Sequence, residues 1–322
     1  MSLLSTAAGA LRGGSQGAAV ESAAAELDGF AGAAASAPGA APAVASLFPR
    51  CANPQCASGW LHLWRSRCTP VFEGGWSCSP ACTRARVGAA LRREIEAGGA
   101  PVEKHRHRIP LGLAMLEQGW ITAAALRRAL AAQRSAGGGR LGQWLIRGQA
   151  ASEAGVTRAL ALQWNCPVLA LEHHDPEAVA YNLPRLFVDA LGALPLRVAA
   201  GRILYLGFCG ALDPVLALAV ERMTGLRVES GLVEEQRFRA AHARMLQARF
   251  PAVELIESRS APALTQAMAR AIERFRPAQA RLVRVHEFFW LRAWSHAQTG
   301  AAARCGEVRD LICSLGPGSA AG

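Results

Sequence analysis

The chain has 322 residues, and 51% of them are hydrophobic, so it is long enough to form more than one domain with a buried core. The formal net charge is +11, but 34 of the 35 basic residues are arginine and only Lys104 is lysine. A phosphate-binding Walker loop needs Gly-Lys-Ser/Thr, whereas Lys104 lies between Glu103 and His105, so P-loop ATP hydrolysis is excluded. We expect a protein that is not an enzyme.

The first part of the chain predicts neither a folded domain nor a membrane anchor. Residues 1–47 are mostly Ala, Gly and Ser with four charged residues, which predicts a disordered tail. This tail lacks the basic start and sustained apolar core of a secretory signal, and no window of the chain reaches roughly 18 uninterrupted apolar residues. We therefore expect a cytoplasmic protein without membrane insertion.

The positive charge is compatible with nucleic-acid binding, because clustered cations bind phosphate. Here, however, the arginines are spread along helical patterns such as RRALAAQR and RAIERFR, often beside glutamate. Such spacing is typical of solvated helix faces. We do not expect a nucleic-acid partner, and a zinc-dependent nucleic-acid-binding protein is kept only as an alternative.

Residues 48–100 form a cysteine-rich segment that contains five of the nine cysteines. Cys51 and Cys56 form one close pair and Cys78 and Cys82 a second, each on turn-forming sequence. Two such pairs suit a tetrahedral thiolate zinc site, because each turn presents two sulfur atoms to the same metal. The prediction is a structural zinc-binding module, since a closed four-sulfur site leaves no open position for catalysis.

The zinc assignment has alternatives within the same segment. Cys68 can replace one ligand or stay a free thiol, His62 lies in an apolar run that predicts a strand, and all five cysteines can stay without metal. The stretch WSCSPACTRARVGAALRREIEA resembles the second half of a treble-clef zinc finger, in which the last ligands lie at the start of a helix. Its cysteine spacings are wider than the usual Cys-x-x-Cys.

Residues 106–165 contain the same helical pattern twice. IPLGLAMLEQGWITAAALRRALAAQ and RLGQWLIRGQAASEAGVTRALALQ each have apolar residues at helical spacing and a central turn, with Gly119 and Gly148 in those turns. Thr122 and Ser152 stand where a helix N-cap is expected, so the pattern predicts two helical hairpins. The matched positions are Leu111-Gly112 with Leu141-Gly142, and Gln133 with Gln163.

These repeated loops and the segment after them, residues 108–247 in all, resemble the N-terminal (MshEN-type) domain of type II secretion and type IV pilus assembly ATPases. In that family the repeat runs Arg-Leu-Gly, an apolar helix, Gly, an Ile/Leu-Thr cap, an Ala-Leu pair and Gln. Some members use the two copies to bind cyclic di-GMP. By this resemblance the nucleotide-binding candidates are Leu111, Gly112, Gln133, Arg140, Leu141, Gly142 and Gln163.

The first copy departs from the family pattern, because Pro110 occupies the position of the arginine and Arg108 comes two residues too early. Loss of a guanidinium damages ligand binding more than it damages a fold. We therefore expect the hairpins to serve as a scaffold. The resemblance implies a non-catalytic adaptor or regulatory protein that binds secretion or pilus components, and a cyclic di-GMP receptor is the alternative.

Residues 166–250 alternate short β-rich runs with helical patterns, which predicts an α/β subdomain, and the resemblance includes this module. The expected strands are VLAL, ALPLRV, RILYLGF and LRVES, and Asp213-Pro214 is expected to start a helix. His173-His174-Asp175 is expected to lie in an exposed loop, because adjacent residues on an extended chain point in opposite directions.

Residues 258–315 are predicted to form two amphipathic helices separated at Pro277. The second would carry an aromatic cluster that packs on its own domain or binds a partner; its members are Phe288, Phe289, Trp290 and Trp294. The whole chain is thus predicted to be an α+β protein, with a zinc-binding module, duplicated helical hairpins, a small α/β sandwich and a helical tail.

Overall fold

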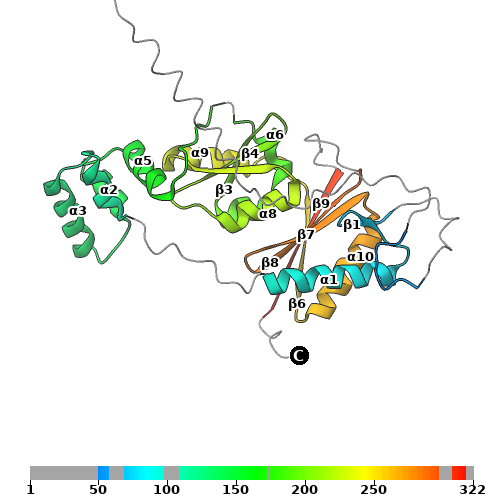
Figure 1. Cartoon of the computed structure of the whole chain (residues 1–322). Coiled ribbons are helices and arrows are strands. Elements are labelled where there is room, and N and C mark those ends of the chain that lie inside the picture. The colour runs from blue at the N-terminus through cyan, green and yellow to red at the C-terminus, as the bar shows by residue number, and fades with distance from the viewer. Residues whose placement is uncertain (1–49, 58–68, 98–108, 173, 297–306, 317–322) are drawn as a thin grey trace, which may run out of the picture. The chain divides into compact units, whose positions relative to one another are not determined.

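The structure is a computed structural model that describes residues 50–57, 69–97, 109–172, 174–296 and 307–316 (Figure 1). The predicted disordered tail of residues 1–47 lies outside the described residues, as do His62, Cys68, Arg108 and His173. None of the helices in the described ranges combines the length and apolar character needed to cross a membrane.

The cysteine-rich segment forms a short β-hairpin followed by a helix. Strand β1 (Val71–Phe72) pairs with β2 (Gly75–Trp76), and α1 (Pro80–Ala97) follows directly. The hairpin turn places Glu73 and Gly74 in the left-handed region, with φ of 46° and 74°. The helix predicted to follow the last cysteine is confirmed.

The duplicated segment forms four helices, as predicted. They are α2 (Leu111–Glu117), α3 (Ala123–Ser135), α4 (Leu141–Arg147) and α5 (Glu153–Trp164). Thr122 Oγ1 accepts a hydrogen bond from the Ala125 N–H at 3.2 Å, and Ser152 Oγ accepts one from the Gly155 N–H at 3.1 Å. Both predicted N-caps are therefore confirmed, and each removes one unsatisfied donor from the first turn.

The two glycines of the repeated Leu-Gly pairs lie where the helices pack most closely. A Cβ on Gly112 would lie 2.7 Å from Leu126 Cδ1, and a Cβ on Gly142 would lie 2.7 Å from Val156 Cγ1. Leu126 and Val156 are themselves thirty residues apart, so the two copies repeat the same contact. Close helix packing is therefore a sufficient reason for glycine at both positions.

We predict that Gly142→Ala destabilises the protein by about 1–3 kcal/mol, because the added methyl group overpacks a buried contact. Gly112→Ala should cost less, because it meets the flexible end of Leu126, whereas Val156 is β-branched and stiff. Urea unfolding of the two variants measures the difference. Equal stability of Gly142→Ala and the unchanged protein would contradict the packing explanation.

The central turns of the two hairpins use different residues for the same backbone conformation. Gly119 has φ of 68° in the first copy, whereas Gln149 has φ of 53° in the second, and Gly148 beside it has an ordinary φ of −78°. The glycine of the second copy thus lies one residue before the left-handed position, where it cannot remove the backbone strain of that position.

Gln149→Gly is therefore expected to raise the free energy of unfolding by about 0.5–1 kcal/mol, because glycine adopts positive φ without steric cost. The matched change Gly119→Gln should lower it by a similar amount, since no atom lies within 4 Å of the added Cβ and only backbone strain changes. Thermal unfolding of both variants tests this, and the idea fails if both shift the midpoint in the same direction.

The α/β subdomain is built on a three-stranded sheet of order β3-β4-β5, in which β3 and β4 are antiparallel and β4 and β5 parallel. Asp213 Oδ1 caps α8 by accepting from the Leu216 N–H at 3.0 Å, as predicted. The expected VLAL strand is reduced to a single bridge between Val168 and Leu232. The elements are α6 (Pro176–Val179), a 3-10 turn (Ala180–Asn182), α7 (Arg185–Leu191), β3 (Ala193–Ala199), β4 (Ile203–Phe208), α8 (Pro214–Thr224), β5 (Arg227–Leu232) and α9 (Glu235–Met245).

The prediction of a purely helical C-terminal region is wrong. A helix forms before Pro277, but the segments after it are strands of a second, four-stranded sheet of order β6-β9-β8-β7. These elements are β6 (Ala252–Ser258), α10 (Ala261–Phe275), β7 (Gln279–Val285), β8 (Phe288–Trp294) and β9 (Val308–Leu315). The aromatic cluster therefore lies on a central strand, which is buried in the protein's own core.

The reason for this error is that both faces of β8 are buried. Phe289 and Leu291 pack in one core with α1 and α10, while Trp290 and Trp294 pack in another with the α/β subdomain. Trp290 meets Phe187 of α7 edge-on, with ring centroids 5.5 Å apart. Apart from Arg292, apolar residues therefore occupy both faces of β8, which hides the alternation by which a half-buried strand is recognised.

The cysteine-rich segment and the C-terminal sheet share one hydrophobic core although they are far apart in the sequence. Phe72 and Leu91 pack with Met268 and Leu291 in that core. The β-hairpin forms a sheet of its own and lies beside the edge strand β7, because the Val71 N–H donates to the Pro277 carbonyl at 2.9 Å and the Glu73 N–H donates to the Ala280 carbonyl at 2.8 Å. Helices α1 and α10 lie side by side on the sheet (Figure 1).

Candidate metal centre and duplicated loops

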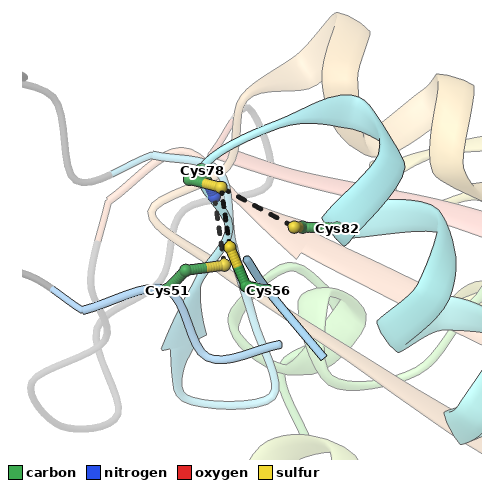
Figure 2. A group of neighbouring side chains, drawn as sticks. All are labelled: Cys51, Cys56, Cys78 and Cys82. Carbon is green, nitrogen blue, oxygen red and sulfur yellow. Dashed lines mark hydrogen bonds between the residues drawn. The ribbon is translucent and has the colours of Figure 1, made fainter. Parts of the chain in front are cut away.

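The four predicted metal ligands converge on one point. The sulfur atoms of Cys51, Cys56, Cys78 and Cys82 all lie within 4.8 Å of one another, and they point inward in Figure 2. Cys56 Sγ and Cys78 Sγ are 3.5 Å apart, and Cys78 Sγ and Cys82 Sγ are 3.6 Å apart. Sulfur atoms around a tetrahedral ion with bonds of about 2.3 Å are roughly 3.8 Å apart, so the four cysteines suit a metal ion.

Local structure positions each pair of sulfur atoms. Cys51 and Cys56 flank a turn in which the Cys56 N–H donates to the Asn53 carbonyl at 3.0 Å. Cys78 precedes α1 and Cys82 lies in its first turn. Two donors also approach the sulfurs: Asn53 Nδ2 lies 3.4 Å from Cys82 Sγ, and the Cys78 N–H lies 3.5 Å from Cys51 Sγ. Such contacts stabilise thiolate charge around a bound metal.

Burial changes the acidity of two of these thiols. Burial, with hydrogen bonds from the neighbouring Cys56 and Cys82 sulfurs, raises the pKa of Cys78 to about 12, and burial also raises the pKa of Cys51. Without a cation the thiols of Cys51 and Cys78 therefore hold their protons at neutral pH. A metal ion must displace those protons to bind, so metal affinity is expected to rise with pH.

Arg86 supports the hairpin beneath the cysteines, a role that the sequence did not indicate. Its guanidinium donates to the carbonyl oxygens of Phe72 and Gly75 and lies 5.7 Å from the centre of the Phe72 ring. A Cβ on Gly75 would lie 2.3 Å from Ala52 Cβ, so only glycine lets the two segments approach. Neither residue carries a spacing signal that reasoning from the sequence alone could use.

Four of the seven nucleotide-binding candidates line one cavity of about 370 Å³. These four are Leu111, Arg140, Leu141 and Gly142. The opposite wall comes from the α/β subdomain, including Cys209, Gly210 and Glu235, and Glu153 of α5 completes it. The motif gave no hint of these additional residues, because only the fold brings them to the repeated loop.

The two repeated glutamines contact backbone atoms of the other copy. Gln133 Nε2 donates to the Gly139 carbonyl at 2.6 Å, and Gln163 Nε2 donates to the Ile109 carbonyl at 2.8 Å. Gly139 and Ile109 each come two residues before the repeated Leu, so the bonds are reciprocal. Each glutamine thus binds the loop that precedes the other copy's first helix. Gly112, another candidate, is covered by the Leu126 side chain.

Pro110 preserves the turn of the first loop but not its charge. The Pro110 carbonyl accepts from the Leu113 and Ala114 N–H groups at 2.9 and 3.0 Å, as the Arg140 carbonyl does from the equivalent residues of the second loop. The Arg140 side chain reaches the α/β subdomain, where Nη1 lies 3.5 Å from the position of a Cβ on Gly210. The cavity therefore has one guanidinium from the repeats.

Comparison with known proteins finds similarity only among solved structures. No family model matches the sequence, and no curated protein matches it. A structure of MshE with cdg is 28% identical and covers 43% of this chain and 99% of that chain, with a TM-score of 0.36. Two structures of the N-terminal domain of XpsE are 21% identical, covering 42% and 43% of this chain and 91% and 98% of theirs, with TM-scores of 0.30 and 0.24. The chain is similar to N-terminal domains of the MshE and XpsE kind.

Proposed function

We propose that this chain is a non-catalytic cytoplasmic adaptor or regulatory protein that acts by binding components of a secretion or pilus machine. Its four cysteines hold one structural zinc ion, because four thiolates in tetrahedral arrangement favour zinc and leave no open coordination position. The resemblance of residues 108–247 to the MshEN-type domain supports the choice of partner.

One observation carries the binding role. Ile109, Leu113 and Leu162 are 53–56% exposed, although each is a large apolar side chain. The bond from Gln163 to the Ile109 carbonyl brings the end of α5 to the start of α2, so the three lie on adjoining segments. We call them the apolar patch. The matched positions in the other copy are Gly139, Gln143 and Ala132, so the patch is not part of the repeated architecture.

Exposed large apolar side chains of this kind suit a protein partner. Co-purification of the tagged full chain from its native cells, followed by mass spectrometry, tests this. A secretion or pilus component should be recovered, and recovery should fall with the double change Leu113→Gln and Leu162→Gln. Leu218→Gln is the matched control, because Leu218 is 57% exposed on α8. Recovery of no such component, together with no self-association, would contradict the proposal.

A cyclic di-GMP receptor is the second candidate, supported by the cavity beside Arg140 and by the MshE structure with cdg. Arg140 can donate two parallel hydrogen bonds to phosphate or to guanine. Calorimetry with cyclic di-GMP should then give heat that Arg140→Ala abolishes. Arg147→Ala is the control, because Arg147 stacks on Trp144 and does not line the cavity. No heat with the unchanged protein rejects this candidate.

The nucleic-acid alternative is tested with the same protein. Contacts to phosphate release counterions, so affinity must fall steeply as salt rises. Binding that is absent, or that is insensitive to salt, rejects it.

A further inference from the structure

A buried carboxylate connects three elements that are distant in the sequence. The Glu94 side chain, on α1, is only 2% exposed. Its oxygens accept from Arg222 Nη1 and Nη2 of α8 at 3.1 and 2.5 Å, and from the Arg284 backbone N–H of β7 at 3.1 Å. Arg93 of the same helix adds a contact at 3.2 Å. Glu94 therefore joins the cysteine-rich segment, the α/β subdomain and the C-terminal sheet.

The charge on Glu94 needs these partners. Burial by itself would raise the pKa of Glu94, but the hydrogen bonds and charge of Arg222, with the Arg284 N–H and Arg93, hold the pKa below its usual value. The carboxylate therefore stays ionised at neutral pH. A buried charge that loses its partner is strongly unfavourable. The pair of Glu94 and Arg222 therefore stabilises the native contact between α1 and α8.

Helix α1 also leads directly to the metal centre. Cys78 and Cys82 stand on either side of its first residue, and Glu94 lies twelve residues after Cys82, about 18 Å along a helix. Between these points Val87 and Leu91 are buried against α10. Thr83 Oγ1 contacts Glu273 Oε1 of α10 at 2.5 Å. The first turn of α1 and the Glu94 carboxylate are thus parts of one continuous helix.

A second arginine, on strand β7, contacts the C-terminal end of α8. Arg281 Nη1 of β7 donates to the carbonyls of Arg222 and Met223 at 3.0 Å each. These carbonyls belong to the end of α8, where backbone acceptors are unsatisfied by the helix itself. The end of α8 therefore contacts the sheet through Arg281 and contacts α1 through Arg222.

We propose that metal binding at the four cysteines controls the docking of α8 on α1 and β7. The bound ion fixes the first turn of α1 and so places Glu94 to receive Arg222, whereas loss of the ion frees that turn and weakens the contact. A metal-dependent contact of this kind lets the cysteine-rich segment regulate the subdomain that follows the hairpins. The inference rests on the proposed metal site.

Hydrogen exchange of the full chain tests this, with the metal content measured on the same samples. Removing the metal with a chelator should speed exchange of the α8 amides by roughly tenfold, since local opening rates follow local stability. Glu94→Gln in metal-loaded protein should speed α8 exchange similarly while leaving the metal content unchanged. Glu254→Gln is the control. Glu254 lies on β6 and pairs with Arg274 of α10, so its replacement should leave α8 exchange unaffected.

The outcomes separate the two proposals. Protein purified without any metal rejects the metal site itself. Metal that is bound and then removed, with α8 exchange unchanged, rejects the coupling and leaves the metal site standing. If Glu94→Gln fails to fold, Arg222→Gln replaces it, because Arg222 is 43% exposed. Arg222→Lys should then restore part of the protection of the α8 amides against exchange. Equal α8 exchange in all the Arg222 variants would also reject the coupling.

Discussion

Asp310→Asn is expected to lower the free energy of unfolding by about 3–5 kcal/mol, the range for breaking a buried ion pair. Asp310 accepts hydrogen bonds from Arg292 Nε, Arg292 Nη2 and Trp290 Nε1, each at 2.7 Å. Asp310 and Arg292 are each 1% exposed. An amide cannot balance the buried guanidinium, which also donates to the Tyr181 carbonyl at 2.8 Å.

Urea unfolding measures this loss. Glu235→Gln is the control, because its ion pair with Arg239 is solvent-exposed and should be worth less than about 1 kcal/mol. Replacing both charges, with Arg292→Met and Asp310→Leu, should recover much of the stability because no unpaired charge is left. A loss below 1 kcal/mol for Asp310→Asn would mean that the pair is not essential to the sheet.

Cys82→Ser is expected to abolish binding of one zinc ion per chain and to lower stability by several kcal/mol, because metal binding in small sites contributes directly to folding. The sulfur of Cys82 lies 3.6 Å from that of Cys78, so its loss removes one corner of the site. Elemental analysis gives the stoichiometry and urea unfolding gives the stability.

Cys166→Ser is the matched control for the metal site. Cys166 is half-buried like Cys51, but it is not one of the four clustered cysteines. It should keep the metal and nearly all of the stability. Equal metal content in Cys82→Ser and Cys166→Ser would contradict the four-cysteine assignment.

Local patterns were sufficient to predict the duplicated helices and the converging cysteines. Thr122 and Ser152 are N-caps because hydroxyl oxygens satisfy the first-turn donors, a signal contained within four residues. The cysteine pairs likewise depend on short turns, so their spacing indicated which sulfurs come together. The α+β class followed from the alternation of such local elements.

The strands after Pro277 could not be predicted in the same way. Phe288 to Trp294 is apolar except for Arg292, because α1 and α10 cover one face and the α/β subdomain covers the other. Those covering elements come from distant parts of the chain, so they cannot be inferred from a short window of sequence. The shared core of the cysteine-rich segment and the C-terminal sheet was hidden for the same reason.

The candidate loops show the same limit at the level of single residues. The repeat identified Gln133 and Gln163 as important, but only the fold reveals that each binds the backbone of the opposite loop. The repeated position of these two glutamines is therefore explained without a ligand. Arg140 is different, because its side chain lines the cavity that Glu153 and Glu235 complete.

The most direct test of the adaptor function is the affinity of the purified full chain for the secretion or pilus component recovered with it. We predict that the Leu113→Gln and Leu162→Gln double variant weakens binding at least about tenfold, the effect of losing roughly 1.4 kcal/mol of contact energy. Leu218→Gln should bind as the unchanged protein does. Equal affinity of the double variant and the unchanged protein, at equal stability, would contradict binding through the apolar patch.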